Sequence, residues 1–107
     1  MDLNHMNFKE KQTLVKRIAK KYRDGKLLLR QQPSLWEMKQ ENHADCIRFC
    51  RKMDQILMAM RLEYAFIIQK EFFEEKDENW YRNYFSEEEY KMYKKGAVDT
   101  FLHCVYG

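Results

Sequence analysis

The chain has 107 residues, enough for one domain, and 45% of them are hydrophobic, which supplies a core and excludes wholesale disorder. It holds only one proline and three glycines, so the frequent turns that strands require are missing and helices are expected. No apolar run reaches the roughly 18 residues of a membrane span, and residues 1–5 lack the order of a signal peptide. Three cysteines, an odd number, favour reduced thiols, so we expect a cytoplasmic protein.

The net charge of +3 is unevenly distributed along the chain. Residues 1–30 carry nine Lys and Arg against three acids, a net of +6, whereas residues 53–78 have a net of −4. A basic head followed by an acidic segment indicates that one end meets an anionic partner. The alternative is that two oppositely charged helices attract each other within one fold.

The N-terminal third predicts a basic amphipathic helix over residues 7–24, with apolar residues at helical spacing and Asp24-Gly25 as its end. Residues 26–30 fit either a short helix or an extended segment. Pro33 disfavours helix at the residue before it, and Ser34 then suits the cap of a short helical turn.

The middle of the chain has a strong helical pattern from residue 42 or 45 to residue 75. One helix of that length would exceed the usual range of about 8–20 residues. We therefore expect a core helix over 42–60 and a break near Arg61, although the pattern leaves open a single continuous helix.

The last third predicts a short aromatic segment over residues 80–85, followed by a capped helix over 87–104. The apolar stripe of that helix is expected to pack against the helix before it. The predicted contact surface joins Tyr90, Tyr93, Ala97, Phe101 and Leu102 to Leu62, Ile67, Ile68 and Phe72. Ser86 and Glu89 have the spacing of a capping box, and Glu87–Glu89 suit the positive end of the helix dipole. The predicted order of elements in this part of the chain is a helix, a short helix, a tight junction and a capped helix. This order is typical of a helix-turn-helix.

Several residues of this segment carry a family resemblance. They are Leu62-Glu63-Tyr64, Ile67-Ile68, Phe72-Phe73, Tyr84-Phe85, Ser86, Tyr90, Lys94-Lys95, Ala97 and Phe101-Leu102. On these residues, 61–105 resembles the region-4 domain of bacterial sigma factors, and more closely the sigma-like regulators of Firmicute phages and their mollicute relatives. The resemblance covers about 45 of 107 residues and implies a transcription-associated protein that binds DNA, RNA polymerase or both.

One departure from that family concerns the start of the last helix, which in those proteins enters the major groove. This chain has Glu87, Glu88 and Glu89 there, and three carboxylates facing phosphates would be repelled. The same helix-turn-helix can instead present these acids to a protein partner, so we assign Glu87, Glu88 and Glu89 as candidate partner-binding residues.

Phosphate contacts would then come from lysines and one arginine elsewhere. The candidates for nucleic-acid binding are Lys16, Arg17, Lys20 and Lys21 in the first helix and Lys91, Lys94 and Lys95 in the last. The alternative for the first helix is a solvated amphipathic surface with no ligand.

No catalytic or metal centre is predicted. His43, Cys46 and Cys50 share one helical face, but no paired-cysteine zinc motif is present, and buried cysteines commonly act as small apolar residues. The three glycines are isolated, so no phosphate-binding loop exists, and the acids between 71 and 78 lack a metal-loop pattern. We expect no enzyme, no cofactor and no small-molecule substrate.

Together these patterns predict one all-α domain over 1–107, a compact bundle of four or five helices ending in a helix-turn-helix: a basic N-terminal part (1–30), a core helix (42–60) and the helix-turn-helix-like segment (61–105). The predicted partners are DNA and/or RNA polymerase. The alternative is a helical protein–protein interaction module, or a homodimer, that does not bind DNA.

Overall fold

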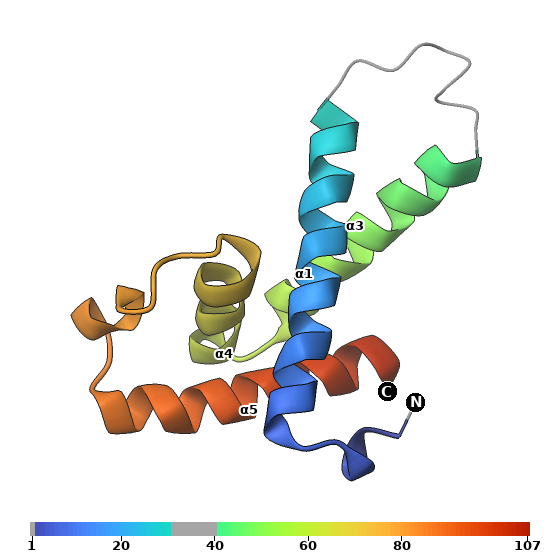
Figure 1. Cartoon of the computed structure of the whole chain (residues 1–107). Helices are drawn as coiled ribbons and strands as arrows, with labels where there is room; N and C mark the ends of the chain where they lie inside the picture. Colours follow the sequence, from blue (N-terminus) through green and yellow to red (C-terminus); the bar gives the residue numbers. More distant parts are fainter. Residues whose placement is uncertain (1, 31–40) are drawn as a thin grey trace.

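A computed structural model describes residues 2–30 and 41–107, and all the regular structure in that part is helical, as predicted (Figure 1). The elements are η1 (Leu3–His5), α1 (Phe8–Arg30), α3 (Glu41–Ala59), α4 (Leu62–Ile67), η2 (Ile68–Phe73), η3 (Trp80–Asn83) and α5 (Glu87–Tyr106). The predicted helical turn capped by Ser34 lies outside the described residues.

The start of α1 is fixed by a reciprocal pair of hydrogen bonds. The Glu10 amide donates to Asn7 Oδ1 at 2.8 Å, and the Asn7 amide donates to Glu10 Oε1 at 3.2 Å. This pair satisfies amides that the first helical turn leaves without partners. The helix then runs through Asp24 and Gly25 to Arg30. The prediction that Asp24-Gly25 ends the helix was wrong, and the five residues after Gly25 are helical.

Gly25 serves a close helix crossing instead of a helix end. A Cβ atom at this position would lie 2.9 Å from Cys50 Sγ and 3.0 Å from Cys46 Sγ, too close without displacing one of them. Cys46 Sγ also donates a hydrogen bond to the Gly25 carbonyl at 3.4 Å. Because glycine has no side chain, α1 and α3 approach each other closely here. In Figure 1 the C-terminal end of α1 and the N-terminal end of α3 extend away from α4 and α5, whereas the N-terminal half of α1 crosses α5.

The break predicted near Arg61 is confirmed. α3 ends at Ala59, Met60 and Arg61 leave the helix, and α4 begins at Leu62. α4 passes directly into the π-helix η2, whose wider turn is closed by the bond from the Glu74 amide to the Gln69 carbonyl at 2.9 Å.

The end of η2 is a left-handed turn at Glu75, whose φ is 51°. The Lys76 amide then donates to the Lys70 carbonyl at 3.1 Å, which satisfies a carbonyl at the helix end. A turn over 78–79 leads into η3, which forms the first four residues of the predicted aromatic segment.

The predicted capping box is confirmed at the start of α5. The Glu89 amide donates to Ser86 Oγ at 3.1 Å, and the Ser86 amide donates to Glu89 Oε1 at 3.1 Å. Glu87, Glu88 and Glu89 occupy the first turn, where carboxylates interact favourably with the helix dipole. α5 continues to Tyr106, two residues beyond the predicted end.

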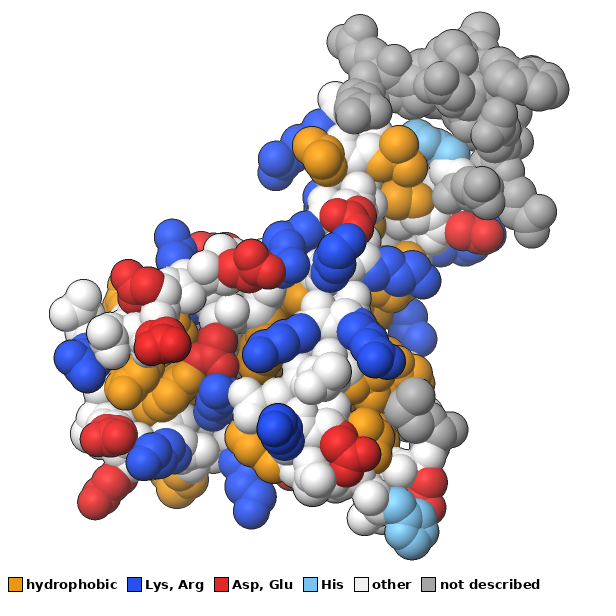
Figure 2. Space-filling model, viewed as in Figure 1, with side chains coloured by type: hydrophobic (Ala, Val, Ile, Leu, Met, Phe, Trp, Pro, Cys, Tyr) orange, Lys and Arg blue, Asp and Glu red, His pale blue; other side chains and the backbone are white. Residues whose placement is uncertain are grey.

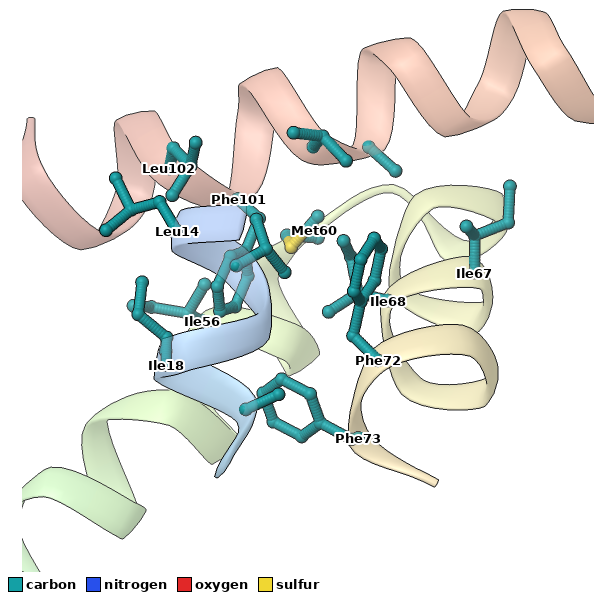
Figure 3. Packing of buried hydrophobic residues seen from close by; sticks show 14 of the residues in the cluster. Leu14, Ile18, Ile56, Met60, Ile67, Ile68, Phe72, Phe73, Phe101 and Leu102 are labelled. Carbon is teal, nitrogen blue, oxygen red and sulfur yellow. The ribbon is translucent and has the colours of Figure 1, made fainter. Parts of the chain in front are cut away.

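One hydrophobic core joins the helices (Figure 3). Phe101 and Leu102 of α5 are fully buried and share it with Ile67, Ile68 and Phe72, as predicted. The other buried members are Leu3, Leu14, Val15, Ile18, Ala19, Met53, Ile56, Met60, Phe73, Trp80, Tyr90, Ala97 and Val98.

Leu62 was wrongly predicted to pack in this core. It is the first residue of α4, at the corner that follows α3, and it is 80% exposed. Tyr93, the remaining member of the predicted contact surface, is partly buried against the core.

Replacing Phe101 by alanine tests this core. Phe101 is 0% exposed and its ring meets Phe73 edge-on at 5.9 Å. We expect Phe101→Ala to lower the free energy of unfolding by about 3–5 kcal/mol, because it removes buried apolar area and leaves a cavity. Denaturant unfolding measures the change. The control Met92→Ala, at a position 62% exposed on the same helix, should change it by less than about 0.5 kcal/mol. Equal effects of the two would contradict the packing described.

The crossing at Gly25 has its own test. Alanine is the better helix former by about 1 kcal/mol, but its Cβ would crowd Cys50 Sγ. We therefore expect Gly25→Ala to be destabilising or neutral in the natural chain. In a Cys46→Ala/Cys50→Ala background the same change should be more favourable by about 1 kcal/mol or more, since the sulfur atoms are gone. A double-mutant cycle from unfolding curves measures this coupling, and a coupling near zero would refute the close approach.

Candidate nucleic-acid interface

α1 carries nine Lys and Arg and only two acids, and three of the cations are used inside the fold. Lys11 Nζ lies 2.8 Å from Asp99 Oδ1 on α5. Arg23 donates to the Phe72 carbonyl at 2.6 Å, and Lys26 Nζ lies 3.1 Å from Asp54 Oδ2 on α3. These contacts join α1 to three other elements. Lys26 thus pairs with an acid of residues 53–78, and Arg23 also lies 2.6 Å from Glu75 of that segment. The predicted attraction between the basic and acidic parts is therefore present for these two side chains, whereas Lys11 pairs with an acid outside that segment.

The other six cations of α1 are exposed, and four of them form what we call the basic ridge: Lys9, Lys16, Arg17 and Lys20. Arg30 lies apart, at the C-terminal end of the helix. Lys9, Lys16 and Lys20 recur at intervals of seven and four residues, which places them on one helical face. Lys20 has only a solvent-exposed pair with Asp24 at 2.9 Å, and such pairs contribute little. Figure 2 shows Lys and Arg side chains along α1 on the viewed face.

Lys21 lies apart from the ridge, although the sequence grouped it with Lys16 and Lys20. Its ammonium sits over the Phe49 ring, 4.2 Å from the ring centre, on the side of α1 that meets α3. This position follows from the helical turn, because residue 21 is about 100° around the axis from residue 20.

The three lysines predicted on the last helix have different environments. Lys91 forms an exposed pair with Glu87 at 3.4 Å. Lys94 Nζ lies 2.7 Å from Glu71 Oε2, with side chains only 20% and 18% exposed, so its charge is used within the fold. Lys95 is exposed and has no acidic partner in the part of the chain that the structure describes.

Glu71 is the centre of a polar cluster that the sequence did not indicate. Besides Lys94, its carboxylate accepts hydrogen bonds from the Tyr90 hydroxyl and from Trp80 Nε1, the latter at 3.3 Å. Tyr81 stacks flat on Tyr90, with ring centres 3.8 Å apart and an interplanar angle of 2°. The cluster joins η2, η3 and α5. The only sign of this cluster in the sequence is the high aromatic content of residues 80–90. Glu71, the acid at its centre, lies on another element, so its part in the cluster could not be predicted.

Burial, together with the neighbouring Glu71 carboxylate, raises the pKa of the Tyr90 hydroxyl above its ordinary value. The phenol is therefore neutral at physiological pH and acts as a hydrogen-bond donor to Glu71. Burial likewise raises the pKa of the Cys50 thiol, and nearby Cys46 adds to the effect.

Glu87, Glu88 and Glu89 are all exposed at the start of α5. Glu89 is occupied with the capping box and Glu87 with Lys91. Acidic side chains also gather on the segment beside α1 in Figure 2, where η2 and η3 lie in Figure 1. A phosphate chain approaching this molecule therefore meets favourable charge on α1 and repulsion at the start of α5.

Two of the three cysteines pack at the helix crossing, where Cys50 is buried and Cys46 half-buried, whereas Cys104 is exposed on α5. Within residues 2–30 and 41–107, no three His, Cys, Asp or Glu side chains are grouped to hold a metal ion. The expectation of metal-free thiols stays a prediction.

Comparison with known proteins adds no relative: no family model, curated protein or solved structure matches the chain. No helix in the described ranges has both the length and the apolar character needed to cross a membrane.

The Glu71 cluster can be tested by a change that removes charge but little volume. We expect Glu71→Gln to lower the free energy of unfolding by about 1–3 kcal/mol, because the largely buried Lys94 ammonium loses its counter-ion. Thermal or denaturant unfolding measures the change. Glu75→Gln is the matched control: its carboxylate also contacts a cation, Arg23 at 2.6 Å, but is 67% exposed, so a loss below about 1 kcal/mol is expected. Equal losses would show that Glu71 has no special role.

Proposed function

We propose that this chain is a transcription-associated protein that binds nucleic acid, RNA polymerase or both, and that α1 is its phosphate-binding surface. The observation that carries the proposal is the basic ridge, four exposed cations on one helix. Three other cations of that helix, Lys11, Arg23 and Lys26, are used inside the fold. Lysine and arginine arranged along a helix bind the phosphate backbone without regard to base sequence.

The proposal includes a helix-turn-helix in residues 61–105, in keeping with the resemblance to sigma region 4. The order of elements supports it, since α4 with η2 precedes the short η3 and the capped α5. The roles of the helices differ from that family. Lys94 is held by Glu71 and three acids occupy the first turn of α5, so α1 is the better candidate for phosphate contact.

Salt dependence of binding to a duplex of random sequence tests the phosphate surface. We expect Lys16→Gln/Lys20→Gln to flatten the log–log slope of affinity against salt by up to about 2, because each lost contact removes about 0.9. The control Lys70→Gln/Lys91→Gln removes the same charge from two lysines paired with Glu74 and Glu87. Fluorescence anisotropy at several salt concentrations measures both. Equal slopes for the two variants, or no binding by the natural chain at about 50 mM salt, would refute the proposed phosphate-binding surface on α1.

A second candidate function is a protein-interaction module that does not bind DNA, favoured by the exposed acids at the start of α5. Duplex binding by the natural chain separates the two, and Glu87→Gln/Glu88→Gln tests the role of the acids. If α5 approaches DNA, the removal of repulsion tightens nonspecific duplex binding. If the acids face a basic protein surface, duplex affinity is unchanged and binding to that protein weakens; isolated RNA polymerase is the first partner to measure.

A further inference from the structure

A hollow beside the basic ridge has a mixed lining. It has a volume of about 410 Å³, within the range of small-ligand sites. Lys16 of the ridge forms part of one wall, and Lys76, from the loop after η2, forms part of another. Tyr81 and Tyr90 contribute an aromatic wall, and Asp77 lies among the lining residues.

The aromatic wall is held by contacts within the fold. Tyr81 lies parallel to Tyr90, and the Tyr90 hydroxyl is held by Glu71. Each ring covers one face of the other and Tyr90 is buried, so the second face of Tyr81 is the one that remains for stacking with a base. A wall already fixed in place avoids the entropy cost of ordering side chains on binding.

The charges around the hollow suit a nucleotide better than a bare phosphate. Lys16 is exposed, and Lys76 has only a long pair with Glu74 at 3.7 Å, so both ammonium groups are available to an anion. Lys94 also lines the hollow but is occupied by Glu71. Carboxylates such as Asp77 and Glu78 repel phosphate, yet they accept hydrogen bonds from the amino groups of bases.

We propose that this hollow binds one unstacked nucleotide, with its base against the Tyr81–Tyr90 wall and its phosphate between Lys16 and Lys76. This inference rests on the proposed function and narrows its ligand: the preferred nucleic acid is single-stranded, because a paired base is held in its stack and does not reach the wall. The same chemistry is offered by a free mononucleotide.

The test uses fluorescence anisotropy with a labelled 12-nucleotide single strand of mixed sequence and its duplex, at about 50 mM salt. Tyr81→Leu removes half of the wall, and Tyr84→Leu is its control, an exposed tyrosine just after η3 that does not line the hollow. We expect Tyr81→Leu to weaken single-strand binding at least about fivefold, and duplex binding less than twofold. Tyr84→Leu should change both less than twofold.

Two further variants keep the test independent of folding. Tyr81→Phe preserves the ring and should bind as the natural chain does. Lys76→Gln, at an exposed loop position, should weaken single-strand binding more than Lys91→Gln. If Tyr81→Leu and Tyr84→Leu act alike while the duplex still binds through the ridge, the inference is overturned and the proposed function stands.

Competition with AMP and GMP shows whether the hollow binds a nucleotide of a single strand or a free mononucleotide. Displacement of the single strand only at millimolar mononucleotide supports a site for strands. Mononucleotide binding that depends on Tyr81, without binding of either nucleic acid, supports the hollow and overturns the proposed function. Failure of strand, duplex and mononucleotide to bind overturns both.

Discussion

The Glu71 carboxylate is the contact on which the C-terminal half of the molecule depends. It stands on a π-helical turn and receives Lys94 from α5, the Tyr90 hydroxyl from the same helix and Trp80 Nε1 from η3. A charged group so little exposed is stable only when its hydrogen-bonding capacity is met, and these three donors meet it. The cluster therefore fixes how η2, η3 and α5 lie against each other, and with them the Tyr81–Tyr90 wall of the hollow.

The same contact decides where free positive charge remains. Because Lys94 neutralises Glu71, α5 has little positive charge to offer at its centre, and its first turn is acidic. On α1 the cations separate by helical face. Those facing the bundle hold Asp99, Asp54 and the Phe72 carbonyl, whereas the ridge faces solvent. The positive charge of residues 1–30 thus has two parts. Some cations stabilise the fold through contacts with other elements, and the others form a surface that attracts anions.

This division supports our proposal that α1, and not the last helix as the sigma-like resemblance implies, contacts phosphate. A groove-reading helix needs an N-terminus free of negative charge, and α5 has three carboxylates there that instead serve its cap and dipole. The ridge on α1 has no such conflict, and the hollow at its side combines cations with an aromatic wall. In the proposed function, phosphate contact and base contact fall on neighbouring surfaces built from α1, η2, η3 and α5.

The sequence by itself determined the features that are local along the chain. The helical periodicity, the capping box at Ser86, the break at Arg61 and the buried stripe containing Phe101 depend on residues within a few positions of each other. The tertiary structure decided what depends on distant partners. Gly25 was predicted to mark a helix end because glycine often follows the last residue of a helix. In the fold, α3 passes so close to this position that a side chain on residue 25 would clash with Cys50. Lys94 looked like a surface charge, and only the fold brings Glu71 against it. Arg23 binds a carbonyl 49 residues away, a separation at which no periodicity in the sequence carries information.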